Sequence, residues 1–357
     1  MGDRTPGVVV VGSSFGSRIH VPAARAAGMD VVALVGRKQD RTERRAAKVG
    51  VERACTSLAE ALALPGADAV IIATPPPTHA ELAEEVIAAG RHVLVEKPFT
   101  TDAAEAHHLS DLAHRAGVVA LVGHEFRFAP ARATLQHALR ERMVGQPRMA
   151  TFLGLTGFAA PLDVRMPEWW FDPARGGGWL GAAVSHFVDA VRVWLGEFES
   201  VSGALPVVSD RDPATTAEDS VAFRFRMRSG CEGVLQHSAG VWGPGTNVNL
   251  VAGPLGTLAI QGDAVTFSDA GGTRTLEPAG PPPLEVAPSD EPGHQFSHIE
   301  LGPAVTQASV FKAMVLDQPD PHPFVVPATF TDGVRCMEVL DAVRRSAAEG
   351  GAVVGLP

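Results

Sequence analysis

The stretch "VVVVGSSFGSR", residues 8–18, decides the fold of the first part of the chain. Four consecutive valines predict a buried strand at 8–12, and the residues that follow predict a helix at 17–27. A strand without alternation is typical of a parallel sheet that is covered on both faces. Gly12 would allow the tight turn after the strand, and Gly16 would let the backbone approach a phosphate at the helix N-terminus, where N–H groups favour an anion.

This turn matches the dinucleotide-binding motif only in part. The motif GxGxxG would place glycines at positions 12, 14 and 17, but positions 14 and 17 are serines. Its place after the first strand of a βαβ unit still favours dinucleotide binding over a purely structural turn, and both interpretations stay open here. The predicted cofactor contacts in this turn are Gly12, Ser14, Phe15 and Gly16.

Buried strands and helices continue to alternate as far as residue 123. Strands are predicted at 30–35, 67–74, 92–97 and 118–123, and helices at 39–48, 78–90 and 102–116. Parallel strands joined by helices indicate a doubly wound α/β domain of the Rossmann type, which we place at residues 1–123.

The pattern changes after residue 124. Alternating strands are predicted at 148–155, 220–227, 233–239, 247–253 and 256–262, and helices at 130–143, 178–195, 305–316 and 329–349. Consecutive alternating strands imply an antiparallel sheet with one open face, in a second domain at residues 124–357. The Pro-rich residues 277–293 are predicted to form a loop.

Composition excludes several classes of protein. A length of 357 residues suits two domains, and a net charge of −10 argues against nucleic acid as the main partner. No run approaches the ~20 apolar residues of a membrane span, so we expect no membrane association. Three cysteines without a CxxC pair favour the cytoplasm over a disulfide framework. We predict no metal site, since the nearest cluster, His294, His298 and Glu300, fits a polar loop better.

The end of the second strand discriminates between cofactors. A site for NAD usually has an acidic residue there, whereas this chain has Gly36 followed by Arg37, Lys38 and Arg41. A small residue followed by cations suits a 2′-phosphate, so NADP is favoured as the cofactor and NAD is left open. The alternative is a solvated basic patch at the start of a helix.

The fourth long strand ends in two opposite charges, Glu96 and Lys97. In a parallel sheet, ligands bind beyond the carboxyl ends of the strands, so Lys97 would reach a substrate hydroxyl or the cofactor. A partly desolvated lysine exchanges protons readily, and Glu96 would fix its surroundings. From these residues alone, an ordinary strand-end ion pair explains the pattern equally well.

Several motifs together resemble the glucose–fructose oxidoreductase / inositol dehydrogenase (Gfo/Idh/MocA) family. They are "GRHVLVEKPFT" (90–100), "VVGSSFGSRIHVPAARAAG" (10–28), "IIATPPPTHAELAEEVIAAG" (71–90), "GHEFRFAPA" (123–131) and "GGGWLGAAVSHFVDAVR" (176–192). The resemblance covers nearly the whole chain, and its specificity comes from the combination of motifs. It implies an N-terminal Rossmann domain and a C-terminal α+β domain with a large open, mostly antiparallel sheet. It also implies a cis Lys97–Pro98 bond and a homo-oligomer, a dimer or tetramer, built through that sheet.

The resemblance also implies functional residues. Thr74, Pro75 and His79, around the end of the third long strand, join Glu96 and Lys97 as expected cofactor contacts. His79 is expected only as part of the wall of the cofactor cleft. Family members commonly carry Asp-x-x-x-His on the helix of the second domain.

His186 matches that histidine, but the position of the aspartate is occupied by Ala182. Asp189 is a candidate substitute partner on the same helix face, although a structural role suits it better. His186 remains the best second acid–base group, because its ordinary pKa is near neutrality and because the chain contains no tyrosine.

Three further residues are candidate substrate contacts. Trp169 and Trp170, before the predicted catalytic helix, would line a pocket or form an aromatic corner of the core. Arg127 would bind a substrate or a cofactor phosphate, or would extend its charged end into solvent.

We therefore predict an NADP-preferring oxidoreductase that transfers a hydride at a carbon of a carbohydrate-like substrate, namely a sugar, polyol or keto-sugar. Lys97 and His186 would handle the proton. One alternative is a sugar lyase or glycosidase that recycles tightly held NAD(P). Another is a non-catalytic NADP-binding protein of the same fold, an interpretation that the alanine at position 182 favours.

Overall fold

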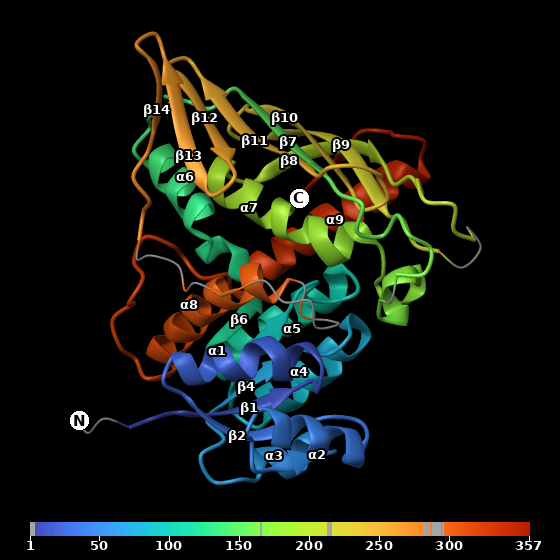
Figure 1. Cartoon of the computed structure of the whole chain (residues 1–357), viewed down its shortest axis with the longest axis vertical. Coiled ribbons are helices and arrows are strands. Elements are labelled where there is room, and N and C mark those ends of the chain that lie inside the picture. The colour runs from blue at the N-terminus through green and yellow to red at the C-terminus, as the bar shows by residue number, and fades with distance from the viewer. Residues whose placement is uncertain are drawn as a thin grey trace. The chain divides into compact units, whose positions relative to one another are not determined.

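The computed structural model describes residues 4–164, 166–212, 216–280, 284, 286–287, 294 and 296–357. The chain divides into two compact units (Figure 1). The first consists of Met1–Thr100, Ala104–Ala129 and Pro282–Val334, and the second of Thr101–Ala103, Pro130–Pro281 and Arg335–Pro357. Within the described ranges, no helix is long and apolar enough to cross a membrane.

The first unit contains a six-stranded parallel sheet in the order β3-β2-β1-β4-β5-β6. Its strands are β1 (Gly7–Val11), β2 (Asp30–Val35), β3 (Ala54–Cys55), β4 (Ala69–Ile72), β5 (His92–Glu96) and β6 (Ala120–Gly123). The order reverses direction at β1, so the ends of β1 and β4 flank the crevice where doubly wound sheets bind ligands. The predicted Rossmann sheet is confirmed.

Helices cover this sheet. They are α1 (Val21–Ala26), α2 (Gln39–Lys48), α3 (Leu58–Leu62), α4 (His79–Ala88), α5 (Ala103–Ala116) and α8 (Ser297–Val315), with short turns η1 (Gly16–His20), η2 (Pro76–Thr78) and η3 (Glu125–Phe128). On one face, Val10 and Ile71 of the sheet pack with Val21 of α1 and Phe311 of α8 in one buried cluster. Every residue of β1 and β4 is buried, which explains their unbroken apolar sequences.

Helix α8 corrects two predictions. It begins at Ser297, eight residues before the predicted 305–316, so His298 and Glu300 lie on a helix and not in a polar loop. It also belongs to the first unit, because Ala304 and Ala308 pack against Ile19 and Ala23. The predicted second domain, residues 124–357, therefore includes a segment that returns to the Rossmann sheet. Most of the predicted loop at 277–293 lies outside the described residues.

The second unit contains a nine-stranded sheet in the order β14-β13-β12-β11-β7-β10-β9-β8-β15. Its strands are β7 (Met149–Leu155), β8 (Phe198–Ala204), β9 (Ser220–Met227), β10 (Glu232–Ser238), β11 (Thr246–Gly253), β12 (Gly256–Gln261), β13 (Ala264–Asp269), β14 (Gly272–Thr275) and β15 (Val354–Gly355). Strands β7 and β10 are parallel, and the other paired strands are antiparallel, as predicted.

One face of this sheet is covered by helices and the other is open. The helices of this unit are α6 (Pro130–Arg140), α7 (Ser185–Leu195) and most of α9 (Phe330–Ala348), with turns η4 (Glu168–Phe171), η5 (Pro173–Arg175) and η6 (Leu180–Val184). Phe152 is fully buried and packs its ring 5.7 Å from Trp194 of α7 and 6.2 Å from Phe225. On the other face, Arg226 pairs with Glu199 and Glu232 and is exposed.

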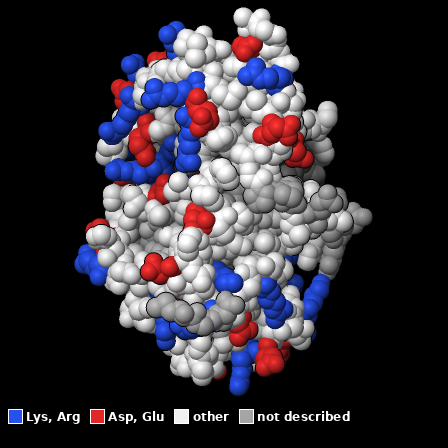
Figure 2. All heavy atoms as spheres, turned by 90° about the vertical axis from the view of Figure 1, so that its left-hand side faces the viewer, with Lys and Arg blue, Asp and Glu red and all other residues white. Residues whose placement is uncertain are grey.

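Side chains of both charge signs lie on the face drawn in Figure 2. On the face drawn in Figure 2, blue and red side chains lie among one another and do not form one continuous basic area.

Candidate functional site

Two glycines shape the turn between β1 and η1. Gly12 has a φ of 124°, and a Cβ there would lie 2.2 Å from the carbonyl oxygen of Ala73. A Cβ on Gly16 would lie 2.9 Å from Val10 Cγ1. Side chains are therefore excluded at both positions, as a turn that brings its backbone close to a ligand requires.

The turn has donors suited to a dinucleotide phosphate. The hydroxyl of Ser17 donates to the carbonyls of Ser13 and Ser14, each at 3.0 Å, which fixes the loop. The first N–H groups of a helix have no partner within the helix and attract an anion. Ser14 is exposed and Phe15 is half-buried, so both are accessible. The residues present fit a nicotinamide dinucleotide, and their contacts with it stay predictions.

The predicted cofactor-discriminating cations are all exposed at the start of α2. Gly36 is required there, because a Cβ would lie 2.5 Å from Thr42 Oγ1. Arg37, Lys38 and Arg41 follow, and no carboxylate of the described residues forms an ion pair with any of them. Three exposed cations without a carboxylate partner are available to bind an anionic ligand.

The side chains of His20 and Glu96 form a buried hydrogen-bonded pair beside Lys97 at the end of β5. His20 Nε2 lies 2.8 Å from Glu96 Oε1, and the backbone N–H of Lys97 donates to Glu96 Oε2 at 3.0 Å. Burial alone would raise the pKa of Glu96, but the hydrogen bond and charge of His20, and then Lys97, hold it below its ordinary value. Glu96 thus serves the site as a buried anion that fixes the backbone of Lys97, while the side chain of Lys97 is half-buried.

A second buried acid, Glu125, is missing from the sequence prediction. It lies in η3, directly after β6, whose Gly123 pairs with Glu96 in the sheet. Glu125 is 2% exposed. Burial raises its pKa well above the ordinary value, and the charge of Glu96 raises it further, while Lys97 acts in the opposite direction. A lone Glu in "GHEFRF" carries no sequence signal that separates it from a surface acid.

A third acid comes from α8. Glu300 Oε2 lies 3.6 Å from Arg18 Nη2, and the guanidinium of Arg18 lies 5.3 Å from the centre of the Phe15 ring. Burial raises the pKa of Glu300, and the charges of Arg18 and Lys97 oppose that rise. The ring of His20 meets the same Phe15 edge to face at 5.5 Å. We call Arg18, His20, Glu96, Lys97, Glu125 and Glu300 the charge cluster.

His79 does not line the cofactor site. Its side chain is 0% exposed. Its Nε2 lies 2.8 Å from the carbonyl oxygen of Thr74, and its Nδ1 lies 3.0 Å and 3.2 Å from those of Pro98 and Phe99. This corrects the prediction of a cofactor contact: His79 joins the segment after β4 to the turn after β5. The Lys97–Pro98 bond in that turn is cis, as the resemblance implied.

Thr74 and Pro75 lie just after β4 and are half-buried. The hydroxyl of Thr74 accepts a hydrogen bond from the Thr78 hydroxyl at 2.7 Å. Both residues are accessible at the ligand edge of the sheet, and their contact with a cofactor stays a prediction.

Arg127 is also buried and serves the structure of the first unit. Its side chain lies 3.0 Å from a carboxylate oxygen of Asp332 and donates to the carbonyl of Val326 at 3.1 Å. Extension of its charged end into solvent is therefore wrong. Because these two groups hold its guanidinium, Arg127 is not proposed as a substrate contact.

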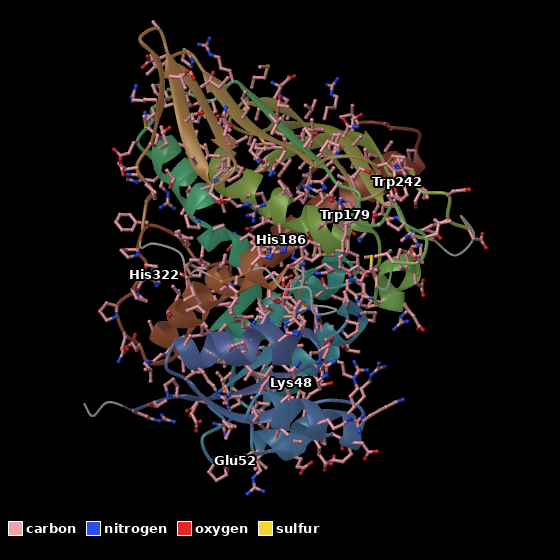
Figure 3. All side chains as sticks on the ribbon, in the orientation of Figure 1. Lys48, Glu52, Trp179, His186, Trp242 and His322 are labelled. Atoms are coloured by element: carbon pink, nitrogen blue, oxygen red, sulfur yellow. The ribbon has the colours of Figure 1, made fainter. Side chains whose placement is uncertain are left out.

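The second unit presents His186 near the start of α7 (Figure 3). His186 is 4% exposed, and its carbonyl accepts a hydrogen bond at 3.1 Å from Arg132 of α6. Ala182 lies in the preceding π-helical turn η6 and is buried, as is Asp189 farther along α7. No carboxylate occupies position 182, so the partner that the family pattern would give His186 is absent from its usual place.

Another histidine of this unit, His237 of β10, was not predicted. The indole N–H of Trp179 donates to its Nδ1 at 2.7 Å, which leaves the proton of a neutral ring on Nε2. Burial, with a smaller contribution from Arg132, lowers its pKa to about 4. The ring of Phe187 lies 4.8 Å away. His237 is therefore a neutral donor within an aromatic surface at neutral pH.

The predicted tryptophans extend this surface. Trp169 and Trp170 form part of η4 and are half-buried, with ring centres 5.6 Å apart. Trp170 lies 5.8 Å from Trp179 and 6.1 Å from Phe158. Their partial exposure allows contact with a ligand, and their role in substrate binding stays a prediction.

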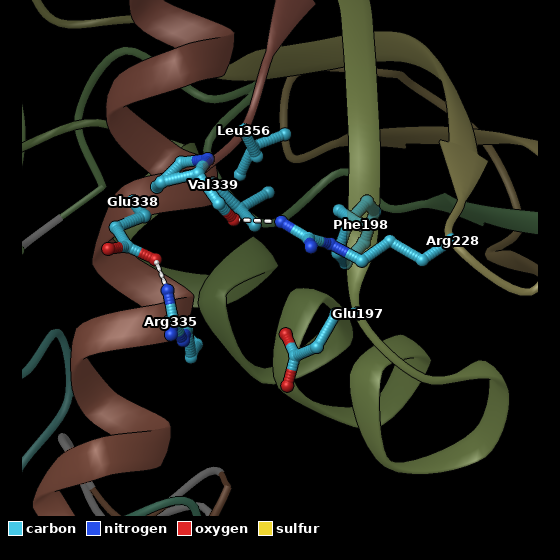
Figure 4. Close-up of a pocket in the computed structure, with 8 residues that line it drawn as sticks. Glu197, Phe198, Arg228, Arg335, Glu338, Val339 and Leu356 are labelled. Atoms are coloured by element: carbon cyan, nitrogen blue, oxygen red, sulfur yellow. Dashed lines mark hydrogen bonds and ion pairs between the residues drawn. The ribbon is translucent and has the colours of Figure 1, made fainter.

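A pocket of ≈ 190 Å³ in the second unit lies apart from these residues (Figure 4). It is lined by Glu197, Phe198, Arg228, Arg335, Glu338, Val339, Leu356 and Pro357. Arg335 pairs with Glu338, and Arg228 donates to the carbonyl of Pro357. None of the predicted site residues lines this pocket. Among the described residues, no group of three His, Cys, Asp or Glu side chains is placed to hold a metal.

Comparison with known proteins gives two family matches. Residues 7–124 match the GFO/IDH/MocA oxidoreductase family with an NAD-binding Rossmann fold, and residues 133–259 match a GFO/IDH/MocA C-terminal domain.

Two curated relatives illustrate the level of similarity. The chain is 30% identical to D-apiose dehydrogenase of Paraburkholderia graminis over 286 residues, which are 78% of this chain and 73% of that protein. It is 31% identical to an uncharacterized oxidoreductase of Synechocystis over 230 residues, which are 62% of each chain. The second match thus spans less than two thirds of that relative.

Solved structures share the fold. A levoglucosan dehydrogenase in complex with NADH and levoglucosan superposes with a TM-score of 0.83 over 99% of this chain and 100% of its own, at 20% identity. At that identity the likeness concerns the fold alone.

Proposed function

Because the chain belongs to the GFO/IDH/MocA family of oxidoreductases, we propose that it transfers a hydride between NADP and a carbon of a sugar, polyol or keto-sugar. The observation that carries the proposal is Lys97, half-buried at the ligand edge of the Rossmann sheet and fixed from behind by the buried pair of Glu96 and His20. The named relatives include sugar dehydrogenases, which supports a carbohydrate-like substrate.

The exposed cations of α2 support NADP as the preferred cofactor. Arg37, Lys38 and Arg41 have no carboxylate partner in the described part of the chain, and an acid that would hold the ribose hydroxyls of NAD is absent from the end of β2. A 2′-phosphate would bind to such cations through charge-assisted hydrogen bonds. The levoglucosan dehydrogenase structure of the same fold holds NADH, so the choice between the two nucleotides has to be measured for this chain.

Different residues of the chain would bind the cofactor, transfer the proton and hold the substrate. The turn at Gly12–Gly16 and the cations of α2 would bind the dinucleotide, which supplies the hydride chemistry when bound. In the direction of ketone reduction, Lys97 Nζ would donate a proton to the substrate oxygen. His186 is the second candidate for that proton, and the aromatic surface of Trp169, Trp170 and Trp179 would hold the apolar faces of a sugar ring.

A screen of sugars, polyols and keto-sugars, followed by the absorbance of reduced nicotinamide with NADPH and with NADH, tests this proposal. We expect turnover with at least one such compound and a higher kcat/KM with NADPH. Turnover of none, together with no binding of either nucleotide, would contradict it.

The recycling alternative predicts a different result, because cofactor would stay bound through gel filtration and product would form without net consumption of NADPH. The non-catalytic alternative predicts NADPH binding without turnover.

We would expect a homo-oligomer to form through the open face of the sheet in the second unit, where the apolar side chains of Val234 and Met149 are exposed.

A further inference from the structure

The helix-covered face of the nine-stranded sheet becomes accessible at His237. Side chains two residues apart on a strand share a face, so His237 of β10 lies on the same face as Leu235, and its partner Gly154 of β7 on the same face as Phe152. Phe152 and Leu235 are fully buried, whereas His237 is partly exposed. A buried strand face therefore ends in a polar side chain that a ligand can reach.

Three neighbours fix the ring of His237. The indole N–H of Trp179 donates to its Nδ1 at 2.7 Å, and the Phe187 ring lies 4.8 Å away. Gly154 makes room for the ring, because a Cβ there would lie 2.2, 2.4 and 2.9 Å from Nε2, Cδ2 and Cε1. These distances place the face of the ring over Gly154, since a carbon in line with the Nε2–H bond would be much farther from both ring carbons than from the nitrogen. The Nε2–H bond therefore runs along the sheet and not into it.

Trp179 is itself held in place by its backbone. Its N–H donates to the carbonyl of Glu218 at 2.8 Å, and the next N–H, that of Leu180, donates to Glu218 Oε1 at 3.1 Å. Gly178 has a φ of 103°, and a Cβ there would lie 2.1 Å from the same carboxylate oxygen. The indole thus reaches His237 from a fixed backbone, and it selects the neutral tautomer whose proton is on Nε2.

We propose that His237 binds an oxygen atom of the sugar or polyol through its Nε2–H, and that Trp179 is the positioning residue that keeps the proton on that nitrogen. The inference rests on the proposed function, because it names one substrate contact of that same site. Within the described part of the chain, no hydrogen bond to Nε2 is found, so this donor is available. Phe187, which contacts the ring, directly follows His186 in α7.

The surroundings of His237 define the kind of ligand that fits. A neutral N–H donates to a hydroxyl, ether or carbonyl oxygen, and all three occur in sugars. Burial lowers the pKa of His237 to about 4, which is consistent with a neutral ring at physiological pH. The rings of Trp170 and Trp179, 5.8 Å apart, would contact the apolar C–H groups of the same molecule. The alternative is a purely structural histidine that only accepts the indole proton.

Nitrogen NMR of protein with isotope-labelled histidine tests the tautomer and the contact without turnover. We assign the His237 signals by their loss in His237→Gln. At pH 7 we expect the proton on Nε2 alone in the wild type, and a proton shared between both nitrogens in Trp179→Phe. D-Glucose, D-xylose and myo-inositol are the probes, each added in the presence of NADPH or NADH. At least one of them should shift the Nε2–H signal of His237.

His92 is the matched control for this titration. Its Nδ1 also accepts an N–H, that of Val119 at 3.0 Å, but it lies at the start of β5, at the opposite end of that strand from Lys97. Its signals should not respond to the sugars. A proton on Nδ1 of His237 in the wild type, or no shift of its Nε2–H with any of the three probes, would overturn the proposal.

Steady-state kinetics on a sugar that is turned over separates the contact from a structural role. His237→Phe keeps a flat ring over Gly154 but removes the donor, and it should raise KM by about 5–100-fold at nearly constant kcat. His237→Gln offers an amide oxygen to Trp179 and an amide N–H to substrate, so it should recover most of that loss. His92→Phe should leave KM unchanged. An unchanged KM in His237→Phe would show that the histidine serves only the indole.

The two readouts distinguish this inference from the proposed function. If His237→Phe does not fold, the Nε2–H shift of the wild type decides alone. A sugar that shifts Nε2–H but is turned over with neither nucleotide supports the His237 contact and contradicts the proposed function. A sugar that is turned over while Nε2–H stays unshifted overturns the contact and leaves the proposed function intact.

Discussion

The candidate site residues of the two units differ in chemical character. In the first unit, the ligand edge of the Rossmann sheet holds a buried cluster of ionised and titratable groups, with Glu96 and His20 2.8 Å apart behind Lys97. In the second unit, the residues near the start of α7 are largely aromatic, with His237 held by the indole of Trp179 and with Arg132 of α6 over the Phe187 ring. From this difference we expect proton chemistry to depend mainly on the first unit, and shape and apolar contact with substrate to depend on the second.

The candidate site residues of both units nevertheless share one backbone feature. A π-helical turn opens the helix in each case, η1 at Gly16–His20 and η6 at Leu180–Val184. Such turns are frequent at functional sites, because they displace side chains from the regular helical positions. In the first unit, the turn ends at His20, the partner of Glu96. In the second, it contains Ala182, where the family pattern would have an acid.

The largest effect should come from the candidate proton donors. Lys97→Met should lower kcat by about 10²–10⁴-fold, the usual loss of a general acid, while NADPH still binds. His186→Gln should cost less, because position 182 offers no carboxylate to charge its imidazole. Steady-state kinetics on one confirmed substrate compares the two. A larger loss for His186→Gln than for Lys97→Met would reverse the assignment of proton chemistry to the first unit.

The next largest effect should be on cofactor choice. Arg37→Ala should weaken NADPH binding by about 10–100-fold, which corresponds to the loss of one hydrogen bond between charged groups. NADH binding should change little, since NADH lacks the 2′-phosphate. Fluorescence titration measures both, with Arg44→Ala as the control, because Arg44 is exposed on the same helix. An equal loss for the two nucleotides would show that Arg37 acts on a part they share.

A moderate effect on stability should come from His237. Burial lowers its pKa from about 6.5 in the unfolded chain to about 4, so between these values the unfolded chain binds more protons. Stability is therefore lost as pH falls through this window, by about 2 kcal/mol at pH 5. His237→Gln keeps an acceptor for Trp179 and should lose about that much less between pH 7 and pH 5. Urea unfolding at both pH values measures it, and identical losses in the two proteins would contradict the buried neutral state.

The smallest effect should come from the aromatic surface. Trp170→Ala should raise the KM for a sugar by about 2–10-fold at nearly constant kcat, in line with 0.5–1.5 kcal/mol for an aromatic contact. Trp242→Ala is the matched control, because Trp242 is 74% exposed. If Trp170→Ala leaves KM unchanged, the tryptophans form a corner of the core and do not contact substrate.

The parallel sheet could be predicted from the sequence because each of its longer strands is an apolar run between turn residues. The range 92–97, for example, differs from β5 by one residue. The family resemblance is confirmed by the matches of both parts of the chain to an oxidoreductase family. Cytoplasmic location, the oligomer and the roles of individual site residues stay predictions.

The features that could not be predicted depend on contacts between residues far apart in the sequence, which a local sequence pattern does not reveal. The start of α8 was missed because polar residues and Pro303 interrupt its apolar spacing, although Ala304 and Ala308 find partners on α1 and η1. Strand β14 is absent from the sequence prediction because it has only four residues and is exposed throughout. The sequence does not distinguish Glu125 from a surface acid, because its burial depends on the surroundings of η3 in the folded chain.

A titration of the intact chain with NADPH and with NADH, followed by nicotinamide fluorescence, tests the central claim most directly. The turn at Gly12–Gly16 predicts that both reduced nucleotides bind, and the cations at Arg37, Lys38 and Arg41 predict that NADPH binds at least about tenfold more tightly. Binding of neither nucleotide, or tighter binding of NADH, would contradict the account.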